Sequence, residues 1–314
     1  MLTMPKSNAA RAENAADSHD TVASAITPGL RVLGLGLAGV VLAGAGLGMW
    51  RMANSGAPGR GAVISGLLLA EVVFGGALVL LGSVVEGFGS GLSLGTRWPY
   101  TRNILTLMLR GDPEAAHRIL ATAVGLTALA LAVLQPGEMS FTGLALIAAT
   151  AVLGMGTLYV LAGRAPAVVH GLHGLLAYLV LLTYLVGIVR PDMSLLRYLY
   201  GTIALHSVLF AILLGGMVTG QRGFGQAIEP FLLPRRSAQW VFVVHGFAAL
   251  LVIGTLGWLS GIYPVAFGLA LVQATAGFFL FHGVNLRPKT PGVIVVFHQS
   301  MALMITLAIV FRWH

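Results

Sequence analysis

The chain has 314 residues, of which 57% are hydrophobic and only 9% are charged, and its mean hydropathy is +0.90. These values exclude an ordinary soluble domain and are typical of a membrane protein with several spans. Cysteine is absent, which excludes disulfides, iron–sulfur clusters and thiolate haem ligands. The formal net charge is +8, and the basic residues fall in short loops, where anionic lipid or an anionic cofactor is a better partner than nucleic acid.

The predicted elements begin with two segments that precede the main apolar runs. Residues 1–28 are polar and show no apolar periodicity, so we expect a mobile N-terminal tail. Residues 29–53 are predicted to form an extra transmembrane helix, because their apolar stretch follows a polar tail and not the compact basic segment of a signal peptide.

Eight further apolar runs are each long enough to span about 30 Å of hydrocarbon. They cover residues 62–86, 114–135, 141–162, 166–189, 198–220, 240–260, 262–284 and 293–311. The runs are continuous and longer than the alternating segments of about ten residues that build a membrane barrel. The predicted fold class is therefore an all-α polytopic membrane protein, in which short connections make neighbouring helices antiparallel.

An internal repeat divides the eight helices into two predicted bundles of four. Gly-Leu-Ala-Leu at residues 143–146 recurs at 268–271, an offset of 125 residues. Repeats of this kind place sites at corresponding positions of the two halves of a membrane protein. We therefore expect an N-terminal half at residues 54–190 and a C-terminal half at residues 191–314.

Four histidines lie a few residues inside the starts of alternate predicted helices. They are His117, His173, His245 and His298, the first and third 128 residues apart and the second and fourth 125 apart. Alternate helices cross in the same direction, so all four imidazoles are expected roughly 5–12 Å below the same membrane surface. Two imidazoles at equal depth on facing helices can bind one haem iron from both sides. This interpretation is favoured over four unrelated polar residues because intramembrane histidines are rare.

Other histidines and another metal are alternatives to this assignment. His170 lies one turn before His173 and could replace it, although the repeat offset favours His173. His206 begins a helix of opposite direction and is predicted to pack or hydrogen-bond. Zinc fits two separated pairs poorly, because zinc sites are compact clusters.

Three charged side chains are further candidates, and these are Glu71, Glu114 and Arg118. Glu114, His117 and Arg118 share one helix face by their spacing. Glu114 could take up a proton or position water near a haem edge, or it could form an ion pair with Arg118, and the two interpretations weigh equally. Glu71 lies in the middle of a span, where a proton route is one interpretation, and a neutral, hydrogen-bonded carboxylic acid is the favoured prediction.

The order of several short motifs resembles the haem A synthase family over residues 62–312. The pattern E-x-x-H-R at residues 114–118 follows Gly89-Ser90-Gly91 and Trp98-Pro99, and it precedes three further motifs. These are Leu172-His173, W-V-x-x-x-H from Trp240 to His245, and His298-Gln299.

The resemblance implies a function and a role for each candidate residue. First-half His117 and His173 would hold the substrate haem O, and second-half His245 and His298 would bind the iron of a haem B cofactor. The reaction would oxidise the C8 methyl group of haem O to a formyl group, with Glu114 as the catalytic residue and Arg118 among the haem-binding residues. The product, haem A, would supply haem-copper oxidases.

The resemblance also implies a location in the inner cell membrane and a set of partners. These are membrane lipid, haem O synthase and assembly factors of cytochrome oxidase, and a homo-oligomer is left open. The alternative function is a non-catalytic bis-histidine b-type cytochrome subunit that relays electrons. A transporter is a weaker alternative, since repeats and buried carboxylates also suit that class.

Overall fold

The computed structural model describes residues 60–99, 103–223 and 226–312. The predicted tail at 1–28 and the predicted helix at 29–53 lie outside the described residues. The described part of the chain is all-helical and contains eight helices long and apolar enough to cross a membrane, which confirms the predicted fold class. These eight are α2 (Arg60–Gly87), α4 (Pro113–Leu134), α5 (Glu138–Leu161), α6 (Val168–Val189), α8 (Ile203–Arg222), α9 (Ser237–Trp258), α10 (Pro264–Leu286) and α11 (Val293–Phe311).

Two short helices lie between the spans, and one of them corrects a predicted boundary. They are α3 (Ile104–Leu109) and α7 (Leu195–Gly201). The predicted run 198–220 is wrong at its start, because Thr202 takes a non-helical conformation and separates α7 from α8. Ser194 caps α7 by accepting a hydrogen bond from the backbone nitrogen of Arg197 (3.3 Å), so this short segment forms a helix of its own.

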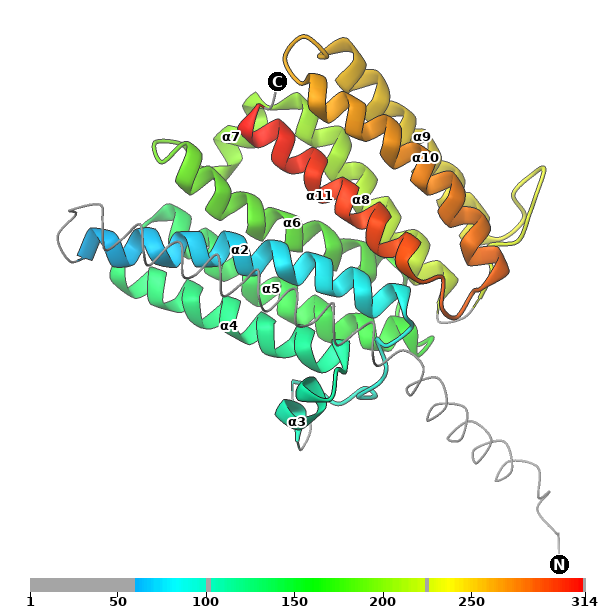
Figure 1. The fold of residues 1–314 in the computed structure, drawn as a ribbon, viewed down its shortest axis with the longest axis horizontal. Helices are drawn as coiled ribbons and strands as arrows, with labels where there is room; N and C mark the ends of the chain where they lie inside the picture. Colours follow the sequence, from blue (N-terminus) through cyan, green and yellow to red (C-terminus); the bar gives the residue numbers. More distant parts are fainter. Residues whose placement is uncertain (1–59, 100–102, 224–225, 313–314) are drawn as a thin grey trace, which may run out of the picture.

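The eight long helices pack in two sets of four (Figure 1). Helices α2, α4, α5 and α6, coloured blue to green, contact one another, as do α8, α9, α10 and α11, coloured yellow-green to red. The two sets meet mainly where α6 packs against α8 and where α2 packs against α11. A large buried cluster of apolar side chains from α6, α8, α9, α10 and α11 includes residues of both sets.

Small residues bring α6 and α8 into close contact. A Cβ atom added to Gly171 would lie 2.5 Å from the carbonyl oxygen of Leu213, and one added to Gly216 would lie 2.8 Å from the Cα of Gly171. Close backbone approach at glycine is the usual way in which membrane helices associate. The crossing places the beginning of α6 beside the end of α8.

Candidate functional site

The four predicted histidines occupy equivalent places in four antiparallel helix pairs. The pairs are α2–α4, α5–α6, α8–α9 and α10–α11, and each histidine lies within the first nine residues of the second helix of its pair. At 1.5 Å per residue, the four imidazoles lie about 6–12 Å from the helix starts. All four therefore lie near the same end of the bundle.

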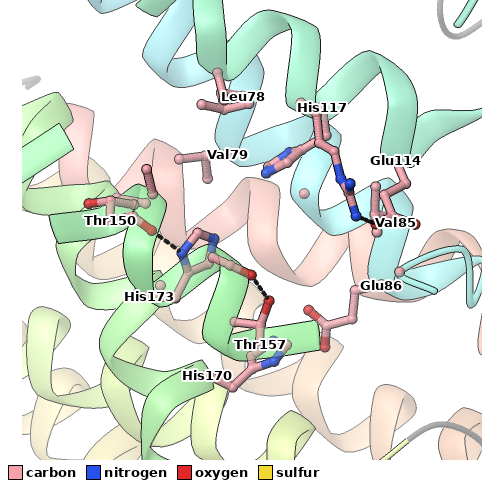
Figure 2. Close-up of a pocket in the computed structure, with 18 of the residues that line it drawn as sticks. Leu78, Val79, Val85, Glu86, Glu114, His117, Thr150, Thr157, His170 and His173 are labelled. Atoms are coloured by element: carbon pink, nitrogen blue, oxygen red, sulfur yellow. Dashed lines mark hydrogen bonds and ion pairs between the residues drawn. The ribbon is translucent and has the colours of Figure 1, made fainter. Parts of the chain in front are cut away.

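His173 shows how the first helix of a pair orients the imidazole. Its Nδ1 lies 3.0 Å from the carbonyl oxygen of Thr150 on α5, and a dashed line marks this contact in Figure 2. In a helix this carbonyl already faces the backbone nitrogen four residues on, at Gly154. A Cβ atom at Gly154 would lie 3.1 Å from Cε1 of His173. The glycine therefore opens the space through which the imidazole reaches the carbonyl.

The same combination of a carbonyl and a glycine four residues later recurs at the other three histidines. The sets are His117 with Leu78 and Gly82, His245 with Ala211 and Gly215, and His298 with Gln273 and Gly277. In these three sets the ring interacts with the carbonyl, although Nδ1 does not reach full hydrogen-bond geometry. An imidazole whose Nδ1 faces a carbonyl keeps its proton there and presents Nε2 to a metal.

The carbonyl–glycine sets also correct the register of the internal repeat. Thr150 and Gly154 of α5 correspond to Gln273 and Gly277 of α10, an offset of 123 residues. The Gly-Leu-Ala-Leu motif repeats with an offset of 125, so within this helix it does not mark equivalent positions. Its match is a similarity of apolar composition, whereas the histidine contacts define the repeat.

In the second half, the rings of His245 and His298 lie close together, with their planes steeply inclined to each other. Their centres are 6.5 Å apart and their planes are inclined by 72°. The side-chain nitrogen of Gln273 lies 3.2 Å from Nε2 of His298. An amide nitrogen only donates, so this contact fits an unprotonated Nε2, and the amide must turn away before that nitrogen can bind a metal.

In the first half, His117 and His173 project from α4 and α6 into one space, as Figure 2 shows. They line a cavity of about 560 Å³ together with His170. This volume lies within the range of about 300–1,000 Å³ typical of small-molecule and cofactor sites. His170 is not part of a carbonyl–glycine set, so the repeated pattern favours His173 over His170 as a ligand.

The start of α4 holds the E-x-x-H-R segment at the cavity. Asp112 caps the helix by accepting a hydrogen bond from the backbone nitrogen of Ala115 (2.8 Å), and Pro113 occupies the first helical turn. Both residue types favour a helix start, so the sequence places Glu114 in the first turn, where its negative charge suits the helix dipole. Glu114 is 4% exposed and lines the cavity.

Glu114 and Arg118 together tie the preceding loop to α4. Glu114 accepts hydrogen bonds from the backbone nitrogen of Leu94 and the hydroxyl of Ser93, both at 3.0 Å, and it forms an ion pair with Arg118. Arg118 also donates to two loop carbonyls, those of Arg97 (2.5 Å) and Pro99 (3.3 Å). The ion pair with Arg118, one of the two interpretations of Glu114, is confirmed, and it belongs to a network that holds this loop against α4.

A second buried polar cluster was missed by the sequence analysis. Glu86 of α2 accepts hydrogen bonds from Thr219 of α8 and from Gln299 of α11, the latter at 2.6 Å. His170 and Arg222 interact electrostatically with the same carboxylate. Glu86 stands at the end of an apolar run, where a charged residue is unremarkable, and its partners are 133 and 213 residues away. The one signal in the sequence for this cluster is Gln299, a polar side chain next to His298 within a predicted span.

Other residues singled out from the sequence lie away from the histidine pairs. His206 lies at the opposite end of the bundle, where its Nε2 is 2.9 Å from the carbonyl oxygen of Leu199. Glu71 is 1% exposed, and its carboxylate oxygens have no hydrogen-bond partner among the described residues. The prediction that Glu71 is hydrogen-bonded is therefore wrong for the described part of the chain.

Comparisons with known proteins add no assignment. No protein-family model, curated protein or solved structure matches this chain. Within the described residues, no three His, Asp or Glu side chains are grouped so as to hold a metal ion. A haem iron takes at most two ligands from the protein, so a site for it does not require a group of three such side chains.

Proposed function

We propose that this protein is a haem-oxidising membrane enzyme of the haem A synthase type. His245 and His298 hold a resident haem B, and His117 and His173 hold haem O as the substrate. The observation that carries the proposal is the 6.5 Å between the ring centres of His245 and His298. Two imidazoles that bind one metal from opposite sides, each by a bond of about 2.0–2.1 Å, have ring centres about 6 Å apart.

The two histidine pairs have different roles in this proposal. The cavity of about 560 Å³ at His117 and His173 provides room for a ligand that enters and leaves. The close approach of His245 and His298 suits a group that stays bound. The resident haem would supply one-electron transfer when bound.

The residues of the chain bind, orient and exchange protons with the substrate. With water as the oxygen source, conversion of a methyl to a formyl group follows R–CH₃ + H₂O → R–CHO + 4 H⁺ + 4 e⁻. The electrons pass to an acceptor outside the chain. Glu114 lines the cavity one helical turn from His117, so it is the proposed proton acceptor. Arg118 keeps Glu114 and the loop before α4 in place.

The experiment that tests this function is pigment analysis of the purified protein. The chain is expressed in cells with and without a source of haem O, and its haem is extracted and identified. Haem A or its alcohol precursor is expected only when haem O is supplied. Haem B alone under both conditions would assign the chain to the non-catalytic cytochrome alternative. A protein without Soret absorbance would contradict both.

The proposed location is the inner cell membrane, and the proposed partners are those that supply haem O and receive haem A. Eight candidate membrane spans and a substrate with a large apolar ring agree with transfer within the bilayer. Haem O synthase and assembly factors of haem-copper oxidases are therefore the partners to seek by crosslinking in membranes.

A further inference from the structure

Arg222 is a buried cation at the wall of the first-half cavity. It is the last residue of α8, it is 6% exposed, and it lines the cavity together with Lys289 of the connection between α10 and α11. Both residues belong to the second half of the chain, whereas His117 and His173 belong to the first. The α6–α8 crossing at Gly171 and Gly216 brings the end of α8 to this cavity.

The guanidinium of Arg222 has too few partners for a buried charge. In the described part of the chain two ion pairs lie within 4 Å, and Arg222 belongs to neither. Its Nη1 lies 3.5 Å from the carbonyl oxygen of Pro288, at the limit of a hydrogen bond. A guanidinium has five donors, and burying a charge is costly unless it is paired.

The nearest acidic side chain only partly balances Arg222. Glu86 interacts with it electrostatically, but the two oxygens of Glu86 already accept from Thr219 and Gln299. The cavity wall carries three cations (Arg118, Arg222 and Lys289) and two carboxylates (Glu86 and Glu114), so 3 − 2 leaves one surplus positive charge. Arg118 is paired with Glu114, which leaves the surplus at Arg222 and Lys289.

We infer that Arg222, assisted by Lys289, binds a carboxylate group of the ligand that occupies the first-half cavity. The second half thereby completes the binding site of the first. The inference rests on the proposed function, in which this ligand is a haem whose apolar ring lies at His117 and His173. A guanidinium suits a carboxylate because it offers parallel donors to both oxygens.

The test compares two probes that differ only in their carboxylates, haem B and haem B dimethyl ester. Full-length protein that carries its second-half haem is placed in phosphatidylcholine nanodiscs, and each probe is titrated while the Soret band is recorded. His117→Ala supplies the background for binding outside the first site. The wild type is expected to bind the acid more tightly than the ester by about ten- to a hundredfold, as for hydrogen bonds to charged groups.

Three variants then show which side chain is responsible for the preference for haem B over its dimethyl ester. Arg222→Gln is expected to weaken binding of haem B by about tenfold or more and to leave ester binding unchanged. Arg222→Lys should lose an intermediate amount of affinity for haem B, since lysine keeps the positive charge but lacks the parallel N–H donors of a guanidinium. Lys289→Gln should lose less affinity for haem B than Arg222→Gln, because the side chain of Lys289 is exposed to solvent. The matched control is Arg164→Gln, an exposed arginine at the same end of the bundle that does not line the cavity.

Each contrary outcome has its own meaning. Equal weakening of acid and ester would show that Arg222 only shapes the cavity, and equal wild-type affinities would exclude a carboxylate subsite; either overturns the inference. Competition by added phosphatidylglycerol in the wild type, lost in Arg222→Gln, would assign the subsite to lipid phosphate and also overturn it. If Arg222→Gln does not fold, as judged by loss of the second-half haem, then Arg222→Lys and Lys289→Gln provide the comparison of acid and ester binding. Absence of any first-site haem binding in the wild type would refute the proposed function itself.

Discussion

The two halves of the protein orient their histidines in the same way but surround them differently. In both halves, each imidazole faces a backbone carbonyl of the neighbouring helix, and a glycine four residues later leaves room for the ring. In the second half the two rings are 6.5 Å apart at their centres. In the first half the rings line a cavity of about 560 Å³ whose wall carries five charged side chains. The same orientation of the imidazole therefore occurs in two surroundings, which the proposed function assigns to a resident haem in the second half and to the substrate in the first.

Removing a histidine of the second pair is expected to have the largest effect on this comparison. His245→Ala and His298→Ala should each abolish the Soret absorbance of the proposed resident haem, because each variant removes one of its two proposed iron ligands. His117→Ala should keep that band and lose only haem bound at the first site. Absorption spectra and extracted haem per protein measure the difference. Equal loss in all three variants would show that the halves do not have separate roles.

Glu114 is expected to matter for the first half alone. Glu114→Ala should retain the second-half haem and lower product formation by about a hundredfold or more, the usual effect of removing a general acid or base. Product is measured by pigment extraction from cells that supply haem O.

Glu114→Gln separates the two roles of this carboxylate. The amide can still accept a hydrogen bond from Leu94 or Ser93 but cannot take up a proton. Activity as low as that of Glu114→Ala would support the role in proton transfer. Near-normal activity would restrict Glu114 to holding the loop.

The glycines opposite the histidines offer a smaller and more selective perturbation. A Cβ at Gly277 would lie 3.2 Å from Cε1 of His298, so Gly277→Ala should turn the ring away from its carbonyl. We expect haem retention in the second half to fall by about tenfold, as for other changes to groups that orient metal ligands. Gly154→Ala should affect only first-site binding.

The control for the glycines is Gly268→Ala on α10, where an added Cβ meets nothing within 4 Å. This variant should keep its haem and its thermal stability, because alanine is otherwise favourable in a helix. Haem loss in Gly268→Ala as large as in Gly277→Ala would mean that the contact with the imidazole is not the cause.

The contact between the halves is expected to respond to Gly171→Ala with the smallest effect on chemistry. The added Cβ would meet the Leu213 carbonyl oxygen at 2.5 Å, which should lower the free energy of unfolding by about 1–3 kcal/mol. Both haem sites should weaken together, as measured by thermal unfolding and Soret absorbance. Gly76→Ala on α2, with open space around its Cβ, is the matched control. Loss of one site alone would indicate that the halves are coupled elsewhere.

Much of the site could be predicted from the sequence, and the missed part has a common physical cause. The depth of the four histidines follows from the helix starts and a rise of 1.5 Å per residue. The partners of Glu86 and Arg222 could not be predicted, because Thr219, Gln299 and Pro288 reach them across helix contacts between distant parts of the chain. The break at Thr202 was missed because both sides of it are apolar.

The amino-acid sequence by itself determined the class of the protein, the eight described spans and the common level of four imidazoles. The reason is that hydrocarbon requires backbone groups to bond within their own helix, so apolar length alone predicts a span. The tertiary structure decided which carbonyl each imidazole faces, that His245 and His298 lie close together, and that Arg222 of the second half reaches the cavity of the first. These contacts depend on how each helix is rotated and crossed against its neighbours, which hydropathy does not encode.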